Sequence, residues 1–207
     1  MDTTLVVGAG TLISKLVKYA VNYHMIGLEA LRDIPASIGG AITMNAGAFG
    51  TEIGDYINHV DVLVGGKICN YTQSECAFAY RQSLFKNTDM IILGAEITLN
   101  YGNLQDIENK LELNHRMRRA TQPTEPSLGS TFKKCMDGSS PAYLIDHMGL
   151  KGKRVGGAMV SIKHSGFIIN TGEATSKNYL DLAEIISEQI YEKYGIILEK
   201  EIIYLKD

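Results

Sequence analysis

Ser130 is the first side chain in this sequence whose surroundings suggest chemistry. It stands between Gly129 and Thr131 in the segment SLGSTFKK, residues 127–134, with two lysines close behind. A serine hydroxyl can attack an electrophile or deliver a proton. No G-x-S-x-G elbow surrounds Ser130, and the sequence places no histidine beside it, so the nucleophilic role is the less attractive one.

A second candidate site is the segment IPASIGGAITMNAGAFG, residues 34–50. Five of its positions are glycine or proline, another five are alanine or serine, and Asn45 stands alone between apolar neighbours. Side chains this small let the backbone approach a flat or extended ligand, and N–H groups in such loops can bind carbonyls or phosphates. An ordinary irregular loop is the alternative. The combination of small and apolar residues favours a ligand-contacting loop.

A third glycine-rich motif, Gly8-Ala9-Gly10, follows a short apolar strand and precedes an amphipathic helix. It resembles a dinucleotide-binding fingerprint, which would make the chain an NAD enzyme. That fingerprint needs glycine where the sequence has Ile13, and an acidic residue about 20 residues further on that is not found. A tight strand-to-helix turn is the better interpretation.

Composition excludes several classes of function. The chain has 207 residues, 45% of them apolar, and a net charge of -3 without a basic stripe, so nucleic acid is an unexpected partner. There is no run of about 18 apolar residues and no leader pattern, which predicts a cytoplasmic protein that does not bind membranes. Three cysteines without a CxxC spacing and five scattered histidines predict no disulfide framework and no metal site.

Periodicity predicts an α+β chain of two unequal lobes, divided in the linker ATQPTEPS, residues 120–127. We expect strands at 4–7, 90–99, 158–162, 166–170 and 196–205, and a hairpin of 59–64 with 67–71. We expect helices at 12–22, 104–119, 141–149 and 176–194. Thr175 or Ser176 should cap the last helix and Gly195 should end it.

Five segments in one order resemble the UDP-N-acetylenolpyruvoylglucosamine reductase family: IPASIGGAITMNAGAFG, YRQSLFK, QPTEPSLGSTFKK, LIDHMGLKGKRVGGAMVSIKHSGFIIN and GIILEKEI. Together they cover nearly all of the chain. The spacing between residues 98 and 104 is similar to that of the shorter, type II branch. The resemblance implies a second flavin-binding subdomain of a vanillyl-alcohol-oxidase-like fold (1–120), a C-terminal α+β substrate-binding domain (121–195) and a strand at 196–207 that returns to the flavin domain.

The resemblance also implies a reaction. FAD, reduced by NADPH, would deliver a hydride from N5 to C3 of the enolpyruvyl group of UDP-N-acetylglucosamine enolpyruvate, and Ser130 would protonate C2. Proton transfer to a carbanion runs downhill once the geometry is fixed, so Ser130 needs placement more than activation. Arg81 and Glu201 would assist with the developing charge. Alternation along a strand does not separate Glu199 from Glu201, and the family's second glutamate selects Glu201.

By the same resemblance, the cofactor contacts are Ile34, Ser37, Gly39, Gly40, Asn45, Ala46 and Gly47, largely through the backbone. The substrate contacts are Tyr80, Gln122, Lys133 and Lys151, with Lys151 near the diphosphate and Lys133 beside Ser130. Alternatively, each of these polar residues is a solvated surface residue without a role in binding. The full-length family member is expected to be a monomer.

The sequence departs from the family at several positions. Asp33 and Ala36 replace glycines around Ile34 and Pro35, and Asp33 brings a negative charge near an anionic cofactor. The family's N-terminal segment that holds the FAD pyrophosphate is expected to be missing. The alternative function is therefore a flavin-free fragment that binds UDP-sugars without activity.

Overall fold

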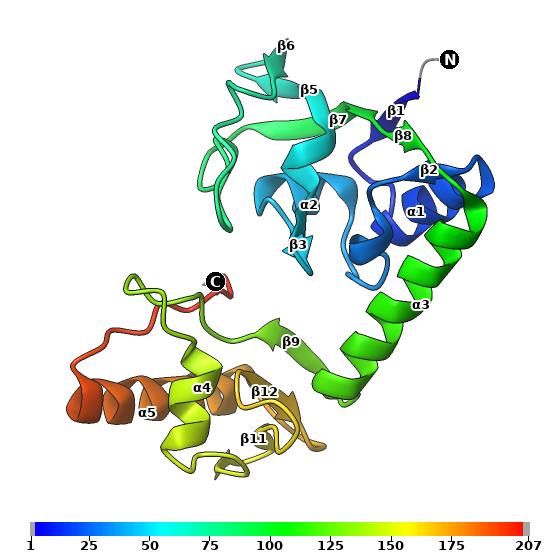
Figure 1. The fold of residues 1–207 in the computed structure, drawn as a ribbon. Helices are drawn as coiled ribbons and strands as arrows, with labels where there is room; N and C mark the ends of the chain where they lie inside the picture. Colours follow the sequence, from blue (N-terminus) through cyan, green and yellow to red (C-terminus); the bar gives the residue numbers. More distant parts are fainter. Residues whose placement is uncertain (1–2, 205–207) are drawn as a thin grey trace. The chain divides into compact units, whose positions relative to one another are not determined.

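The computed structural model describes residues 3–204 and divides the chain into two compact units, Met1–Arg116 and Met117–Asp207 (Figure 1). Each unit has its own cluster of buried apolar side chains. The linker 120–127, where we expected the division, lies just beyond it. No helix among residues 3–204 is long and apolar enough to cross a membrane.

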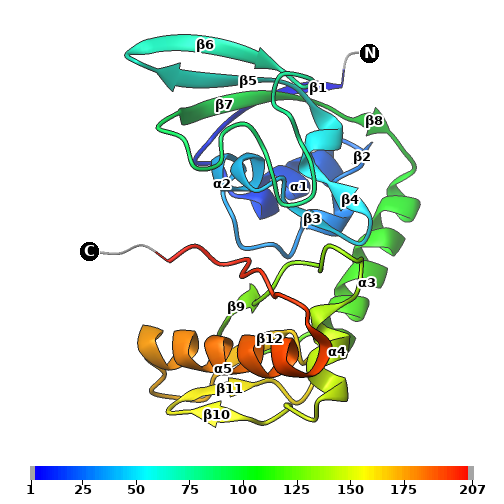
Figure 2. The same cartoon turned by 90° about the vertical axis from the view of Figure 1, so that its left-hand side faces the viewer.

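The first unit is built on a four-stranded antiparallel sheet in the order β1-β7-β5-β6. Its strands are β1 (Thr4–Gly8), β5 (Ile57–Val64), β6 (Lys67–Thr72) and β7 (Ile91–Thr98). Helices α1 (Ile13–Asn22) and α2 (Ile38–Thr43) lie on one face of this sheet (Figure 2). The predicted strands, hairpin and first helix are confirmed. An antiparallel sheet is not the parallel sheet of a dinucleotide-binding fold, so the NAD interpretation of Gly8-Ala9-Gly10 is wrong.

Shorter elements complete the first unit. The pairs are β2 (Met25–Ile26) with β8 (Asn100–Tyr101) and β3 (Gly47–Ala48) with β4 (Thr51–Glu52); η1 (Glu29–Leu31) and η2 (Ile53–Tyr56) are 3-10 turns. The helix α3 (Leu104–Thr121) was predicted, whereas α2 was not. Ser37 starts α2 by accepting a hydrogen bond from the Gly40 N–H, and the buried Ile38, Ala41 and Ile42 hold it against the core.

The second unit is an antiparallel sheet in the order β10-β11-β12-β9, with α4 (Pro141–His147) and α5 (Ser176–Tyr194). The strands are β9 (Ser127–Ser130), β10 (Arg154–Val155), β11 (Ala158–Val160) and β12 (Phe167–Asn170). Thr175 caps α5 in a reciprocal capping box with Asn178. Gly195 ends the helix with φ of 67°, in the left-handed region that glycine adopts without strain.

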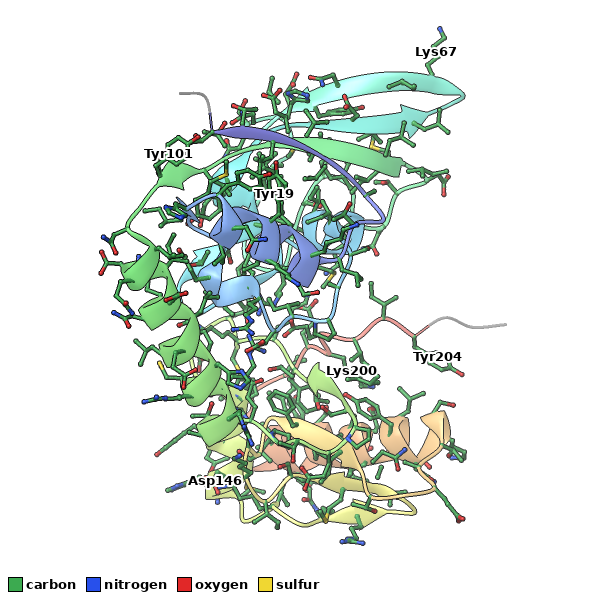
Figure 3. The ribbon with its side chains drawn as sticks, turned by 90° about the vertical axis from the view of Figure 1, so that its right-hand side faces the viewer. Tyr19, Lys67, Tyr101, Asp146, Lys200 and Tyr204 are labelled. Atoms are coloured by element: carbon green, nitrogen blue, oxygen red, sulfur yellow. The ribbon has the colours of Figure 1, made fainter. Side chains whose placement is uncertain are left out.

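The predicted C-terminal strand at 196–205 is wrong over the residues that the structure describes. Residues 196–204 form no strand (Figure 3). Among them only Lys200 makes an isolated antiparallel bridge, with Phe132. A strand needs a hydrogen-bonded partner along its length, and here only residues 131–133 pair with the segment, which is too short a partner for the predicted strand. Residue 205 lies outside the described residues. The bridge pairs the C-terminal segment with residues of its own unit.

Candidate active site

Tyr80 and Arg81 occupy the tip of a two-residue turn in the first unit. The turn is closed by hydrogen bonds from the Ala79 N–H to the Gln82 carbonyl (3.1 Å) and from the Gln82 N–H to the Ala79 carbonyl (3.0 Å). Arg81 has φ of 54°, a left-handed conformation that is rare and strained for a residue with a side chain. Such strain concentrates at functional sites, where the surrounding structure holds it in place.

Three hydrogen bonds tie this turn to the small-residue segment. The Arg81 guanidinium donates to the Gly47 carbonyl (3.3 Å), the Asn45 amide donates to the Ala79 carbonyl (3.0 Å), and the Ser83 hydroxyl donates to the Thr43 carbonyl (2.8 Å). The guanidinium also lies over the Tyr80 ring, 5.0 Å from its centroid. The structure therefore brings together two segments that the sequence analysis selected separately.

Asn45 holds the small-residue segment in place. Its side chain is 1% exposed, and its amide also donates to the Glu52 carboxylate (2.7 Å) while its carbonyl accepts the Gly54 N–H (3.1 Å). A Cβ on Gly54 would come within 2.8 Å of the Asn45 carbonyl oxygen, so only glycine fits there. The Asn45 side chain is therefore engaged by the protein itself, and its backbone N–H donates to the Ile42 carbonyl (3.2 Å).

The remaining residues expected to contact the cofactor are all at least partly exposed. Gly39 donates its N–H to the Ala9 carbonyl (2.9 Å), and a Cβ on Gly39 would lie 3.1 Å from the Ala9 methyl, so two small-residue segments meet here. Gly8, Gly10 and Gly40 are exposed, and beside Gly8 and Gly10 there is open space. Ile34, Ser37, Ala46 and Gly47 are partly exposed. This surface of backbone and small side chains can approach a flat cofactor closely.

Asp33, a departure from the family pattern, has cationic partners in the same unit. Its carboxylate lies 3.0 Å from the His115 ring and 4.0 Å from the Arg32 guanidinium. His115 belongs to α3, so the contact joins the start of the small-residue segment to that helix. The arginine, and the histidine when protonated, offset the negative charge that this substitution introduces.

Ser130 lies at the end of β9 in the second unit, with an exposed side chain. The next residue, Thr131, is 1% exposed and donates its N–H to the Gly166 carbonyl (2.9 Å). The Thr131 carbonyl accepts the Glu201 N–H (2.9 Å), and the Lys133 N–H donates to the Glu199 carbonyl (2.9 Å). This short antiparallel pairing fixes Glu201 one backbone position away from Ser130.

The same pairing separates the roles of the two glutamates. Glu199 forms an ion pair with Lys133, and its side chain is 71% exposed. Glu201 is half-buried, and its negative charge contributes to raising the pKa of Tyr179, for which burial is the larger cause. Glu201 is therefore the less exposed of the two glutamates.

A pocket of about 260 Å³ lies beside this arrangement in the second unit. Leu128 of β9, Ile168 of β12 and Tyr179 of α5 contribute apolar walls, and Asn170 at the end of β12 and Thr175 and Ser176 at the start of α5 contribute polar groups. Apolar walls with a few polar groups are typical of small-molecule sites. Lys151 pairs with Asp146 (2.7 Å), and the Gln122 side chain accepts a hydrogen bond from Arg118 (3.3 Å).

Comparison with known proteins matches both parts of the chain. Residues 122–205 match the model of the C-terminal domain of UDP-N-acetylenolpyruvoylglucosamine reductase, and residues 1–70 match an FAD-binding domain. The reductase of Thermotoga sp. (strain RQ2) is 40% identical over 96% of this chain and 66% of its own length. That of Francisella tularensis is 39% identical over 97% and 72%.

The chain belongs to the UDP-N-acetylenolpyruvoylglucosamine reductase family. Its fold is similar to the crystal structure of the reductase from Thermus caldophilus, with a TM-score of 0.85, 37% identity, and coverage of 97% of this chain and 72% of that one. This is an enzyme family of FAD-dependent oxidoreductases with the α+β fold expected from the sequence. The chain spans about two thirds of the length of the curated relatives it matches.

Within this reductase family fold, the predicted site residues fall into two groups, one in each unit. Arg81 donates to the Gly47 carbonyl in the first unit, and in the second the segment that follows Ser130 pairs with residues 199–201. The sequence analysis missed Thr131 and Tyr179. Tyr179 lies in the predicted helix 176–194, and no motif in the sequence distinguishes it from the other residues of that helix.

Proposed function

We propose that this protein takes part in peptidoglycan precursor synthesis by reducing UDP-N-acetylglucosamine enolpyruvate to UDP-N-acetylmuramate, with NADPH as the reductant and FAD as the cofactor. The observation that carries the proposal is the pairing of residues 131–133 with 199–201, which places Glu201 opposite Thr131, the residue that follows Ser130. Family membership supports the reaction class. We further propose a cytoplasmic monomer.

Three side chains carry the roles that the reaction needs. When bound, FAD would supply the hydride that adds to C3 of the enolpyruvyl group. Ser130 then donates its proton to C2, which needs a fixed hydroxyl and not a lowered pKa. Arg81 provides a guanidinium in a rigid turn to stabilise negative charge on the substrate carboxylate, and Glu201 provides a hydrogen-bonding partner that acts before protonation.

Different parts of the chain would bind the cofactor and the substrate. Residues 1–120 contribute the flavin-binding part, where the small-residue segment from Ile34 to Gly47 would contact FAD, largely through its backbone. Residues 121–195 contribute the substrate-binding part. The pocket beside Tyr179 would take part of the UDP-sugar, and Lys133, Lys151, Gln122 and Tyr80 would contact its polar groups. Lys133 and Lys151 are paired with carboxylates, so an anionic diphosphate would exchange for Glu199 and Asp146.

Replacing the serine tests the proposal. Ser130→Ala should leave flavin reduction by NADPH intact and lower turnover of the enolpyruvyl substrate by about a hundredfold or more. Ser130→Cys, which keeps a proton donor, should recover part of the turnover. Stopped-flow absorbance of the flavin separates the two half-reactions. Normal turnover in Ser130→Ala would rule out the proton-donor role.

The visible spectrum of the purified chain comes before these kinetics. A flavin band that stays with the protein through gel filtration supports the reductase. A colourless protein that binds the UDP-sugar in a calorimeter would instead support the alternative, a flavin-free binding fragment.

A further inference from the structure

Tyr179 connects the wall of the pocket to the backbone that carries the proposed catalytic groups. Its ring lines the pocket, and its hydroxyl donates a hydrogen bond to the Thr131 hydroxyl at 3.2 Å. Tyr179 is 8% exposed and Thr131 is 1% exposed, so water has little access to this hydrogen bond. The hydrogen bond joins α5 to the residue that follows β9.

Thr131 is the residue through which Ser130 and Glu201 are held together. It follows Ser130 directly, its carbonyl accepts the Glu201 N–H (2.9 Å), and its N–H donates to the Gly166 carbonyl (2.9 Å). The hydrogen bond from Tyr179 adds a side-chain constraint to these two backbone constraints. Removing it would leave a buried threonine hydroxyl without this partner and free to rotate.

We infer that Tyr179 is a positioning residue that fixes Thr131, and through Thr131 the relative placement of the Ser130 hydroxyl and the Glu201 carboxylate. The inference rests on the proposed function. Burial, and to a smaller extent the charge of Glu201, raises the pKa of Tyr179, so the hydroxyl keeps its proton and remains a donor. Proton delivery by serine depends on geometry, and a loosened Thr131 affects that step more than it affects binding.

A second tyrosine on the same helix, Tyr194, provides a control. The Tyr194 hydroxyl is buried without a hydrogen-bond partner among the residues that the structure describes. Tyr179 and Tyr194 thus offer a matched pair on α5. Replacing each by phenylalanine removes one buried hydroxyl and keeps the ring.

The experiment measures steady-state kinetics of the whole flavin-loaded chain with the enolpyruvyl UDP-sugar. Tyr179→Phe should lower kcat about tenfold, with KM for the UDP-sugar changed less than about twofold, and it should raise the solvent deuterium isotope effect because the proton step becomes slower. Tyr194→Phe should change none of these. A normal kcat in Tyr179→Phe, or a loss that lies wholly in KM or in flavin content, would overturn the inference.

Two substitutions of Thr131 test the connection itself. Thr131→Val should lower kcat about as much as Tyr179→Phe, and the double variant should lose no more than either single one, because both remove the same hydrogen bond. Thr131→Ser keeps the hydroxyl and should recover kcat. Additive losses would show that Tyr179 acts by another route. If the wild-type chain binds flavin but is inactive, the proposed function is wrong as well. If the wild-type chain is active, the kinetics of the variants test the role of Tyr179 alone.

Discussion

The Lys133 ammonium pairs with the Glu199 carboxylate, two residues before Glu201. The Glu199 side chain is 71% exposed, so this ion pair stabilises the fold by less than about 1 kcal/mol. We expect Glu199→Gln to keep kcat within about threefold of wild type, and Glu201→Gln to lower it about a hundredfold or more. Rates of NADPH consumption at saturating substrate distinguish the two glutamates. Equal losses in both variants would contradict the assignment.

Asn45→Ala should lower the free energy of unfolding by about 2 to 3 kcal/mol, because the Gly54 N–H and the Ala79 carbonyl would lose a buried partner. Urea unfolding followed by circular dichroism measures this change. Asn70→Ala is the control, since Asn70 makes an exposed hydrogen bond to Asp61 and its loss should cost less than about 0.5 kcal/mol. Similar effects of the two substitutions would show that Asn45 does not hold the segment.

Arg81→Gly and Arg81→Ala should both abolish most of the turnover, because both remove the guanidinium. Only the glycine variant relieves the left-handed backbone conformation, with φ of 54°. We therefore expect the glycine variant to be more stable than the alanine variant by about 1 kcal/mol. Thermal unfolding of the two variants side by side measures the difference. Equal stabilities would mean that the turn changes its conformation in the variants.

His164 should make the protein less stable below neutral pH. Burial, and to a smaller extent the charge of Lys151, lowers the pKa of His164 from its usual 6.5, and its Nδ1 accepts the Gly166 N–H (3.1 Å). The unfolded chain then binds a proton more readily than the folded one, so stability falls as the pH drops through about 6.5 towards the folded pKa. In His164→Asn, whose amide oxygen can accept the same N–H, urea midpoints between about pH 7 and 5 should fall less steeply. Parallel pH profiles would contradict this prediction.

Local sequence patterns predicted most elements, and they failed where distant residues decide the structure. The caps at Thr175 and Gly195 placed the long helix correctly because capping depends on residues within one turn. The helix α2 was missed because Gly39 and Gly40 disfavour a helix, and burial of Ile38 and Ile42 outweighs that preference. The C-terminal strand was predicted from alternation alone, which does not show how long a partner the segment will find.

The site residues likewise divide into those that the sequence predicted and those that only the structure revealed. Motif resemblance selected Ser130 and Glu201, and neither spacing nor composition could show that Glu201 pairs with Thr131, since this pairing joins distant parts of the second unit. Thr131 and Tyr179 carry no motif and were found only from hydrogen bonds and burial.

The pairing of Thr131 with Glu201 sets an order of events during synthesis. The ribosome makes the chain from the N-terminus, and Glu201 is added after β9, the rest of the sheet and the whole of α5. The Ser130–Glu201 arrangement can therefore be completed only after all helices and strands of its unit have been synthesised. A nascent chain would bury the core of this unit first. The pairing of residues 131–133 with 199–201, next to Ser130, would form in a later step.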